Sequence, residues 1–166
     1  MTPDPHSGLS GTGIGAVSEY LRAEGIPHEV VEHDETLSAV AEATATQRPP
    51  QQVAKTVVLH DRGAYLLAVI PASQRLDLHK VRELLGANGS LQLATEAQMA
   101  EDFPMLEVGA VPPLGPMMPA AEVVDRRLLD EERVLCSGGD HRHSLLIDPR
   151  DIVAVTGATV ADVCED

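Results

Sequence analysis

Aromatic and basic side chains are scarce in this sequence. Its 166 residues include two tyrosines, one phenylalanine and no tryptophan, and 12 lysines and arginines stand against 26 aspartates and glutamates. A protein that follows a nucleic-acid backbone needs basic residues to neutralise phosphates, and one that holds single strands stacks bases on aromatic rings. The formal net charge of −14 therefore argues against extended tracking of nucleic acid. Any RNA contact must be local or assisted by a partner protein.

Cysteines and long apolar runs are also few. Cys136 and Cys164 form neither a metal motif nor a disulfide framework, so reduced thiols in a cytosolic protein are the simpler expectation. The longest apolar run, residues 65–70, is too short to span a bilayer, and the N-terminus lacks the apolar core of a signal peptide. We therefore expect no membrane association and a cytoplasmic location.

The apolar residues that are present are mostly alanine, valine and leucine, and they contribute to a hydrophobic fraction of 43%. A core of small and branched aliphatic side chains suits strands covered by helices, and a chain of this length supports one domain. We predict a flexible tail over residues 1–13 and a single α/β (α+β) domain over residues 14–166. Its sheet should be mixed and mostly antiparallel, with surrounding helices.

Periodicity and capping residues predict the individual elements. Helices are expected at residues 14–24, 37–45, 78–85, 96–102 and 127–132, and from Pro149 onward. Thr36 and Asp77 are the expected N-caps of the second and third, and Thr95 with Gln98 forms a capping-box pattern for the fourth. Strands are expected at residues 28–33, 53–60, 64–70, 121–124, 134–136 and 143–147, with turns at 61–63 and 137–140.

Lys55 is the most informative single residue. Strand alternation places it on the same face as Val53, Val57 and Leu59, where a lysine costs free energy unless its ammonium meets an anion or an acceptor. The chain has ten arginines and only two lysines, so a lysine at this position indicates that a compact point charge is needed. The alternative is that Lys55 lies near a strand end and extends its ammonium into water.

A proline- and glycine-rich segment is the second feature. Residues 103–119 contain five prolines and two glycines, which predicts a long irregular loop. Its central part, residues 109–115, combines a stiff backbone with glycines that permit close approach to a ligand. Such a loop can direct peptide groups toward a small polar substrate. A rigid surface connection is the alternative.

The segment from Ser137 to His143 is the third feature, because two glycines beside histidines can line a pocket or bind an anion. Together with His28 and His33, His141 and His143 also allow a metal-dependent hydrolase. No H-x-x-x-H or C-x-x-C spacing supports that hypothesis, so we predict no metal and no cofactor, with mostly solvent-facing histidines. The nucleophile elbow, the Walker loop and the Rossmann glycine pattern are all missing.

The order of these features resembles the YbaK-like family, which includes the editing domain inserted into bacterial prolyl-tRNA synthetases. The likeness covers roughly residues 15–164. It is carried, in this order, by residues 53–59, the hairpin after them, 75–77, 91–94, 109–115, 123–125, 137–139, 146–151 and 156–158.

The resemblance implies a free-standing aminoacyl-tRNA deacylase, with alanine or cysteine wrongly attached to tRNA for proline as the expected substrates. It implies that Lys55 is the functional lysine. The substrate-binding positions that it implies are Gly109, Ala110, Val111, Pro112, Pro113, Gly115, Asp125, Gly138, Gly139 and His141, with His143 as a weaker candidate.

An aminoacyl ester is already reactive, so positioning a water molecule supplies much of the acceleration without a protein nucleophile. Lys55 would stabilise developing negative charge, and the adjacent ribose hydroxyl of the substrate would assist the water. The partners implied are the 3′ end of aminoacyl-tRNA and a prolyl-tRNA synthetase or elongation factor that delivers it.

A non-catalytic module is the second hypothesis. In that case the same pocket holds an aminoacyl or nucleotide ligand and regulates a synthetase. A structural scaffold is disfavoured, because a scaffold does not need a charged group on an apolar strand face.

Overall fold

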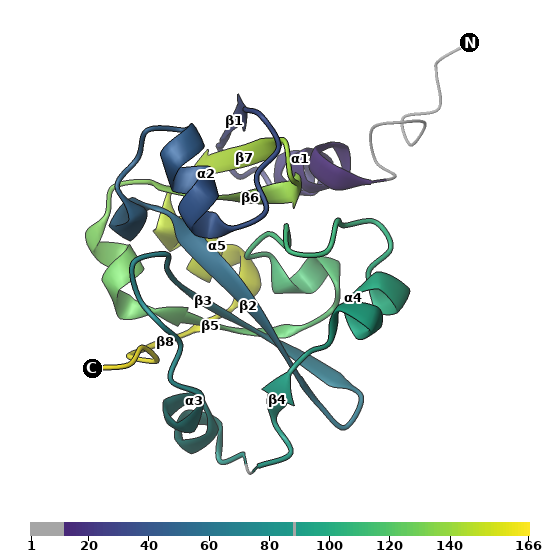
Figure 1. Cartoon of the computed structure of the whole chain (residues 1–166), viewed down its shortest axis with the longest axis vertical. Coiled ribbons are helices and arrows are strands. Elements are labelled where there is room, and N and C mark those ends of the chain that lie inside the picture. The colour runs from purple at the N-terminus through teal and green to yellow at the C-terminus, as the bar shows by residue number, and fades with distance from the viewer. Residues whose placement is uncertain (1–11, 88) are drawn as a thin grey trace.

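Two β-sheets form the framework of the computed structural model, which describes residues 12–87 and 89–166. The smaller sheet has the order β1-β7-β6, and its strands are β1 (Glu29–Glu32), β6 (Val134–Asp140) and β7 (His143–Ile147). The larger has the order β4-β2-β3-β5-β8, with β2 (Ala54–Asp61), β3 (Ala64–Pro71), β4 (Gln92–Leu93), β5 (Ala121–Asp125) and β8 (Thr159–Ala161). In Figure 1 the smaller sheet lies above the long β2–β3 hairpin.

Most strand pairs are antiparallel. The exceptions are β3 with β5 and β5 with β8, which are parallel. The α/β fold with a mixed, mostly antiparallel arrangement is therefore confirmed, although the strands divide into two sheets. The sequence indicated neither β4 nor β8, because both are short and lie at the edges of the larger sheet.

Five α-helices occur in the described residues: α1 (Gly13–Ala23), α2 (Ala39–Ala45), α3 (Leu78–Leu85), α4 (Glu96–Asp102) and α5 (Pro149–Thr156). Asp77 caps α3 by accepting hydrogen bonds from two backbone N–H groups, and Thr95 with Gln98 forms the expected capping box of α4. The expected cap of α2 was wrong, because Ser38 rather than Thr36 accepts the bond from Ala41.

Two further segments differ from expectation. The predicted helix over residues 127–132 is instead a short 3₁₀ helix, η3 (Arg126–Asp130), and the long loop contains another, η2 (Gly115–Met117). The predicted turn at 137–140 is instead the second half of β6. A register shift between Ser137 and Asp140 lets the strand continue through the two glycines, and the chain turns only after Asp140.

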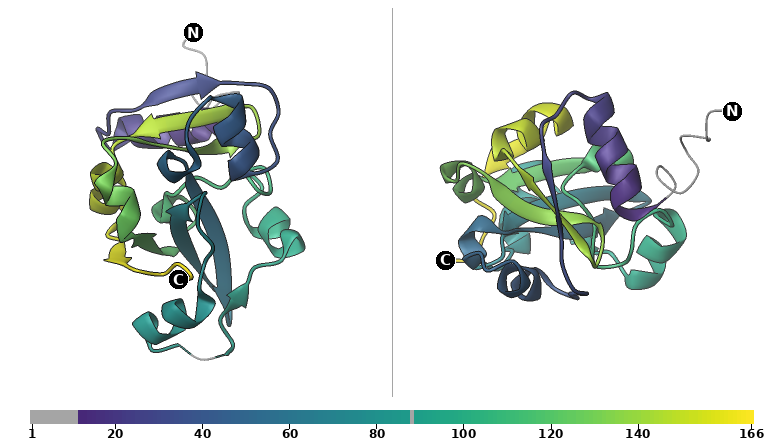
Figure 2. Two further views of the ribbon diagram at one scale, coloured as in Figure 1. Left: turned by 60° about the vertical axis from the view of Figure 1, so that its left-hand side comes forward. Right: turned by 90° about the horizontal axis from the view of Figure 1, so that it is seen from above.

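Three apolar clusters fill the interior. The largest joins α1 and α5 to strands of both sheets and contains Phe103 and Leu114 from the long loop. A second lies on the opposite face of the larger sheet, beneath α3. The third is small and packs Ala43 of α2 against Leu135 and Leu146. Both views of Figure 2 show the helices on the outside of the two sheets.

The predicted tail over residues 1–13 falls largely outside the described residues. Gly13 already begins α1, and its backbone N–H donates a 2.7 Å hydrogen bond to the carbonyl of Met105. Of the helices in the described ranges, none combines the length and apolar character needed to cross a bilayer.

Candidate active site

A pocket of about 270 Å³ opens where the start of α2 meets the start of β2. Polar and apolar side chains share its walls. The lining residues are Leu37, Ser38, Ala39, Val40, Lys55, Thr56, Ala72, Gly109, Val111 and Ser137. Two predicted features, Lys55 and the glycine loop, are thus brought together although they are distant in the sequence.

Pairing between the sheets places Lys55 beside Ser137. Val53 forms an isolated parallel bridge with Leu135, so the residues two positions further along each strand, Lys55 and Ser137, follow on the same side. Both line the pocket. Ser137 was not among the predicted substrate-binding residues. The contact that brings it to the pocket joins strands of two different sheets, and no local sequence pattern records such a contact.

Lys55 is not enclosed as predicted. Its side chain is exposed, whereas Leu59 on the same strand face is fully buried and Val57 packs beside it. The alternative, that Lys55 lies near a strand end and extends into water, describes its exposure correctly. Lys55 is the second residue of β2, and it is exposed. Within the described part of the chain its ammonium has no protein partner, so it remains free to meet a ligand at the pocket wall.

The glycine loop runs inward instead of over the surface. Gly109 is exposed with φ +87°, but Ala110, Val111, Pro112 and Pro113 are all buried. Only Gly109 and Val111 reach the pocket. A left-handed φ at Gly109 is the conformation that glycine adopts without steric cost, and it turns the chain from the pocket rim into the core.

Gly115 lies at the far end of this loop and does not line the pocket. Its N–H donates a 2.8 Å hydrogen bond to Oε1 of Glu122, and a Cβ at this position would lie 2.4 Å from the carbonyl oxygen of Ala120. Glu122 is only 6% exposed. Burial raises the pKa of the Glu122 carboxyl to about 8, against a lowering contribution from the Gly115 bond. Gly115 therefore fixes the loop from within.

His141 also stabilises the loop, from behind. Its Nε2 lies 2.9 Å from the carbonyl oxygen of Val108, and its backbone N–H donates to a Glu107 carboxylate oxygen at 2.8 Å. A Cβ at Gly109 would lie 3.4 Å from the imidazole. His141 is not among the pocket-lining residues, so the structure gives it a position next to the glycine loop rather than on the pocket wall.

Gly138 and Gly139 allow α1 to approach β6. A Cβ at Gly138 would lie 2.9 Å from Ile14, and one at Gly139 would lie 3.0 Å from the backbone of Gly13. Neither glycine lines the pocket; the preceding residue, Ser137, does. The glycine pair thus reflects close helix–strand packing, which sequence alone could not distinguish from a ligand-binding turn.

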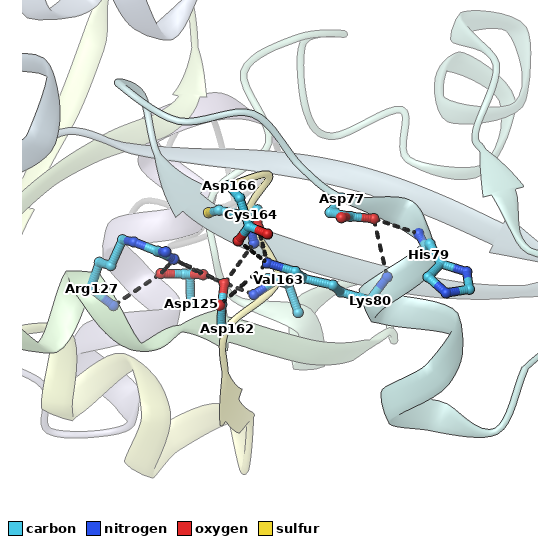
Figure 3. Close-up of polar contacts among 9 residues, drawn as sticks. All are labelled: Asp77, His79, Lys80, Asp125, Arg127, Asp162, Val163, Cys164 and Asp166. Carbon is cyan, nitrogen blue, oxygen red and sulfur yellow. Dashed lines mark hydrogen bonds and ion pairs between the residues drawn. The ribbon is translucent and has the colours of Figure 1, made fainter.

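Asp125 belongs to a separate cluster at the C-terminal end of the chain (Figure 3). It is fully buried, and its two carboxylate oxygens accept hydrogen bonds from Arg127 and from the Val163 backbone. Arg127 also binds Asp162, which pairs with Lys80. The hydrogen bond from Arg127 lowers the pKa of Asp162 to about 2. The structure does not bring Asp125 to the pocket, and its contacts attach the C-terminal segment to the larger sheet.

A buried carboxylate behind the pocket was missed by sequence reasoning. Glu42 of α2 is 3% exposed, and the hydroxyl of Ser144 donates to its Oε2. The hydroxyl of Ser137 lies 3.5 Å from its Oε1, and Ser144 also lies 2.8 Å from Nε2 of His33. Burial raises the pKa of the Glu42 carboxyl, while the Ser144 bond opposes that rise.

The same helix reverses the expected pattern of burial. Leu37 and Val40, which were predicted to form its apolar face, are 73% and 56% exposed at the pocket. Glu42 and Ala43 face the protein instead. A helix of this kind cannot be recognised from apolar spacing, since its buried face carries a charge-bearing residue.

The four histidines of the metal hypothesis have other partners. His28 contacts Ser18, His33 contacts Ser144, His141 contacts Val108, and His143 contacts Asp140. Over residues 12–87 and 89–166, no group of three or more histidine, cysteine, aspartate or glutamate side chains is arranged to hold a metal ion.

The aminoacyl-tRNA editing domain is the family whose model matches the chain, over residues 33–155. This span contains every residue that lines the pocket. The chain belongs to this family and is an aminoacyl-tRNA deacylase, a hydrolase of the ester between amino acid and tRNA. No curated protein matches it significantly.

Solved structures agree with this assignment. A protein described as a candidate trans-editing enzyme for prolyl-tRNA synthetase is 30% identical, has a TM-score of 0.82, and is matched over 92% of this chain and 97% of that one. A hypothetical protein is 31% identical with a TM-score of 0.80, over 90% and 99% of the two chains. A signal-transduction candidate at 21% identity and TM-score 0.67 shares the fold alone, over 91% of this chain and 31% of its own.

Proposed function

We propose that this protein is a cytoplasmic trans-editing deacylase that removes a small amino acid, alanine or cysteine, from mischarged tRNA for proline. One observation carries the proposal: in an editing-domain fold, Lys55 lies unpaired among the described residues on the wall of a pocket of about 270 Å³, together with Gly109 and Ser137. The 30%-identical structure is that of a candidate trans-editing enzyme for prolyl-tRNA synthetase, which supports mischarged tRNA for proline as the target.

Lys55 supplies the charge in the proposed mechanism. Water adds to the ester carbonyl carbon, the carbonyl oxygen gains negative charge, and the ammonium of Lys55 stabilises that charge. The bond from carbon to the ribose oxygen then breaks, and the ribose oxygen takes the proton that the water has lost. The neighbouring ribose hydroxyl assists the water. The products are the free amino acid and uncharged tRNA.

Gly109 and Val111 limit the size of the aminoacyl group. Val111 is 5% exposed, and its loop is held by Gly115 and His141, so this wall cannot easily retreat from a larger side chain. Exclusion of one methylene in an apolar pocket is worth about 1–3 kcal/mol. The expected selectivity is therefore a preference for small residues rather than complete discrimination between alanine and cysteine.

The net charge of the protein affects its affinity for tRNA. A protein of net charge −14 repels phosphates at long range, so we expect modest and salt-sensitive affinity for whole tRNA. A prolyl-tRNA synthetase or an elongation factor that delivers the 3′ end would overcome this repulsion.

A deacylation panel tests the proposal. Purified protein is incubated with tRNA for proline charged with alanine, cysteine, serine or proline, with and without prolyl-tRNA synthetase, and ester loss is followed over time. We expect rapid loss of alanine or cysteine and slow loss of proline. No release from any of these substrates would favour the second hypothesis, a non-catalytic module that uses the same pocket to hold an aminoacyl group.

A further inference from the structure

The pocket wall has opposite polarity at two neighbouring positions. Lys55 brings a positive charge, and Ser137 beside it brings a hydroxyl whose proton is directed at Oε1 of the buried Glu42, 3.5 Å away. A serine hydroxyl has one proton and two lone pairs. When its proton is donated to Glu42, the lone pairs are left to accept a hydrogen bond from a ligand in the pocket.

We propose that Ser137 and Glu42 form the subsite that receives the α-ammonium group of the aminoacyl ester, and this inference rests on the proposed deacylase function. Ser137 is the group that touches the ammonium. Glu42 is a positioning residue that orients the hydroxyl and supplies compensating negative charge from behind the wall.

The contacts of Glu42 fit an ionised acceptor. Its Oε1 faces Ser137, and its Oε2 accepts from Ser144, so two hydroxyl donors are directed at one side chain. A carboxylate without its proton only accepts hydrogen bonds, whereas an amide or a carboxylic acid would also need an acceptor. An ammonium in the pocket favours this ionised form, because a nearby positive charge opposes the effect of burial.

Stability alone is a weak explanation for Glu42. Burying a carboxylate costs free energy, and an apolar residue in this position would hold α2 against the smaller sheet at lower cost. Val40 of the same helix, and Leu37 just before it, are exposed at the pocket instead of buried. The arrangement therefore favours a ligand over helix anchoring.

The positive charge of Lys55 and the negative charge of Glu42 behind Ser137 also define the orientation of the ester in the pocket. With the ammonium beside Ser137 and the carbonyl oxygen beside Lys55, the scissile carbon would be held by contacts on both sides. Fixed orientation of this kind lowers the activation barrier because less freedom is lost on reaching the transition state.

A pair of substrates that differ only at the α position tests the subsite. Alanyl-tRNA is compared with its deaminated product, the 2-hydroxypropionyl ester on the same tRNA. We expect the wild-type protein to hydrolyse the alanyl ester with at least tenfold higher kcat/KM after correction for spontaneous hydrolysis. Glu42→Gln and Ser137→Ala should each reduce kcat/KM at least tenfold for the alanyl ester and less than threefold for the hydroxyl ester. Glu35→Gln, at an exposed position outside the network, is the matched control.

Each result decides between a ligand role and a merely structural one. Equal loss with both esters would show that Glu42 only maintains the fold and would overturn the subsite, as would a wild-type protein that does not distinguish them. If Glu42→Gln fails to fold, Ser137→Ala alone carries the comparison.

A binding measurement separates failure of the subsite from failure of the deacylase function. Adenosine carrying alanine through a stable amide is titrated against its 2-hydroxy counterpart. If no ester is hydrolysed but the amine-bearing ligand binds tenfold more tightly, and Ser137→Ala removes that difference, the subsite stands without the activity. Equal affinity for the two ligands would reject it.

Discussion

The backbone N–H of Gly115 donates a 2.8 Å hydrogen bond to Oε1 of Glu122, while the other carboxylate oxygen has no partner in the described residues. This hydrogen bond joins the inner end of the glycine loop to a buried acid. Burial raises the pKa of Glu122 to about 8, so the folded protein retains a proton that the unfolded chain releases near its ordinary value of 4.5.

Stability should therefore depend on pH through Glu122. Because the folded state binds more protons than the unfolded state between about pH 4.5 and pH 8, its free energy of unfolding falls as the pH rises through that window. The slope from this group approaches about 1.4 kcal/mol per pH unit. Urea denaturation of wild type and Glu122→Gln at several pH values measures it. The variant should lack this component, and identical slopes would contradict the assignment.

Substitution of Lys55 should affect activity and not stability. Its exposed side chain has no protein partner in the described residues, so Lys55→Ala should change the free energy of unfolding by no more than about 0.5 kcal/mol. Deacylation should fall by about 100-fold or more, because a charge that stabilises the developing oxyanion is lost. Rates with mischarged tRNA under single-turnover conditions measure this. Near-normal activity of the variant would remove Lys55 from the mechanism.

The chain's second lysine provides a matched control for that experiment. Lys80 pairs with Asp162 and Asp166 and donates to the carbonyl of Cys164 (Figure 3), and it is not among the residues that line the pocket. Lys80→Ala should lower the unfolding temperature while the folded fraction keeps wild-type kcat/KM. Equal loss of activity in both lysine variants would indicate a general charge effect rather than a site.

Asp125 should behave as a structural residue. Asp125→Ala removes one of the two carboxylate partners of the partly exposed Arg127, and it leaves the buried Val163 N–H without an acceptor, at a cost of about 1–3 kcal/mol. Chemical denaturation measures this loss, and KM of the remaining folded protein should be unchanged. A raised KM with unaltered stability would instead place Asp125 in substrate binding, as the family resemblance first implied.

The glycine pair of β6 should tolerate no side chain. Gly139 has φ +94°, and a Cβ there would lie 3.0 Å from the Gly13 backbone. Gly63→Ala is the control, because φ is +85° at that position but nothing lies within 4 Å of the added carbon. We expect about 1 kcal/mol of destabilisation from the backbone conformation alone. The contact with α1 should add about 1–3 kcal/mol for Gly139→Ala. Equal unfolding midpoints for the two variants would argue against tight packing.

Local interactions made much of this protein predictable from sequence. The N-cap at Asp77, the capping box at Thr95 and the hairpin turn at residues 61–63 depend on groups a few residues apart, and all three form as expected. Lys55 and the glycine loop were also identified from sequence, although Lys55 is more exposed than an apolar strand face suggests.

Tertiary structure decided which of the candidate residues meet. The bridge between Val53 and Leu135 brings Lys55 beside Ser137, and the packing of α2 on the smaller sheet buries Glu42 behind them. It also directs Asp125 into the C-terminal cluster. No local rule contains this information, because each contact depends on the pairing of strands and helices that are remote along the chain and become neighbours only when the apolar clusters close.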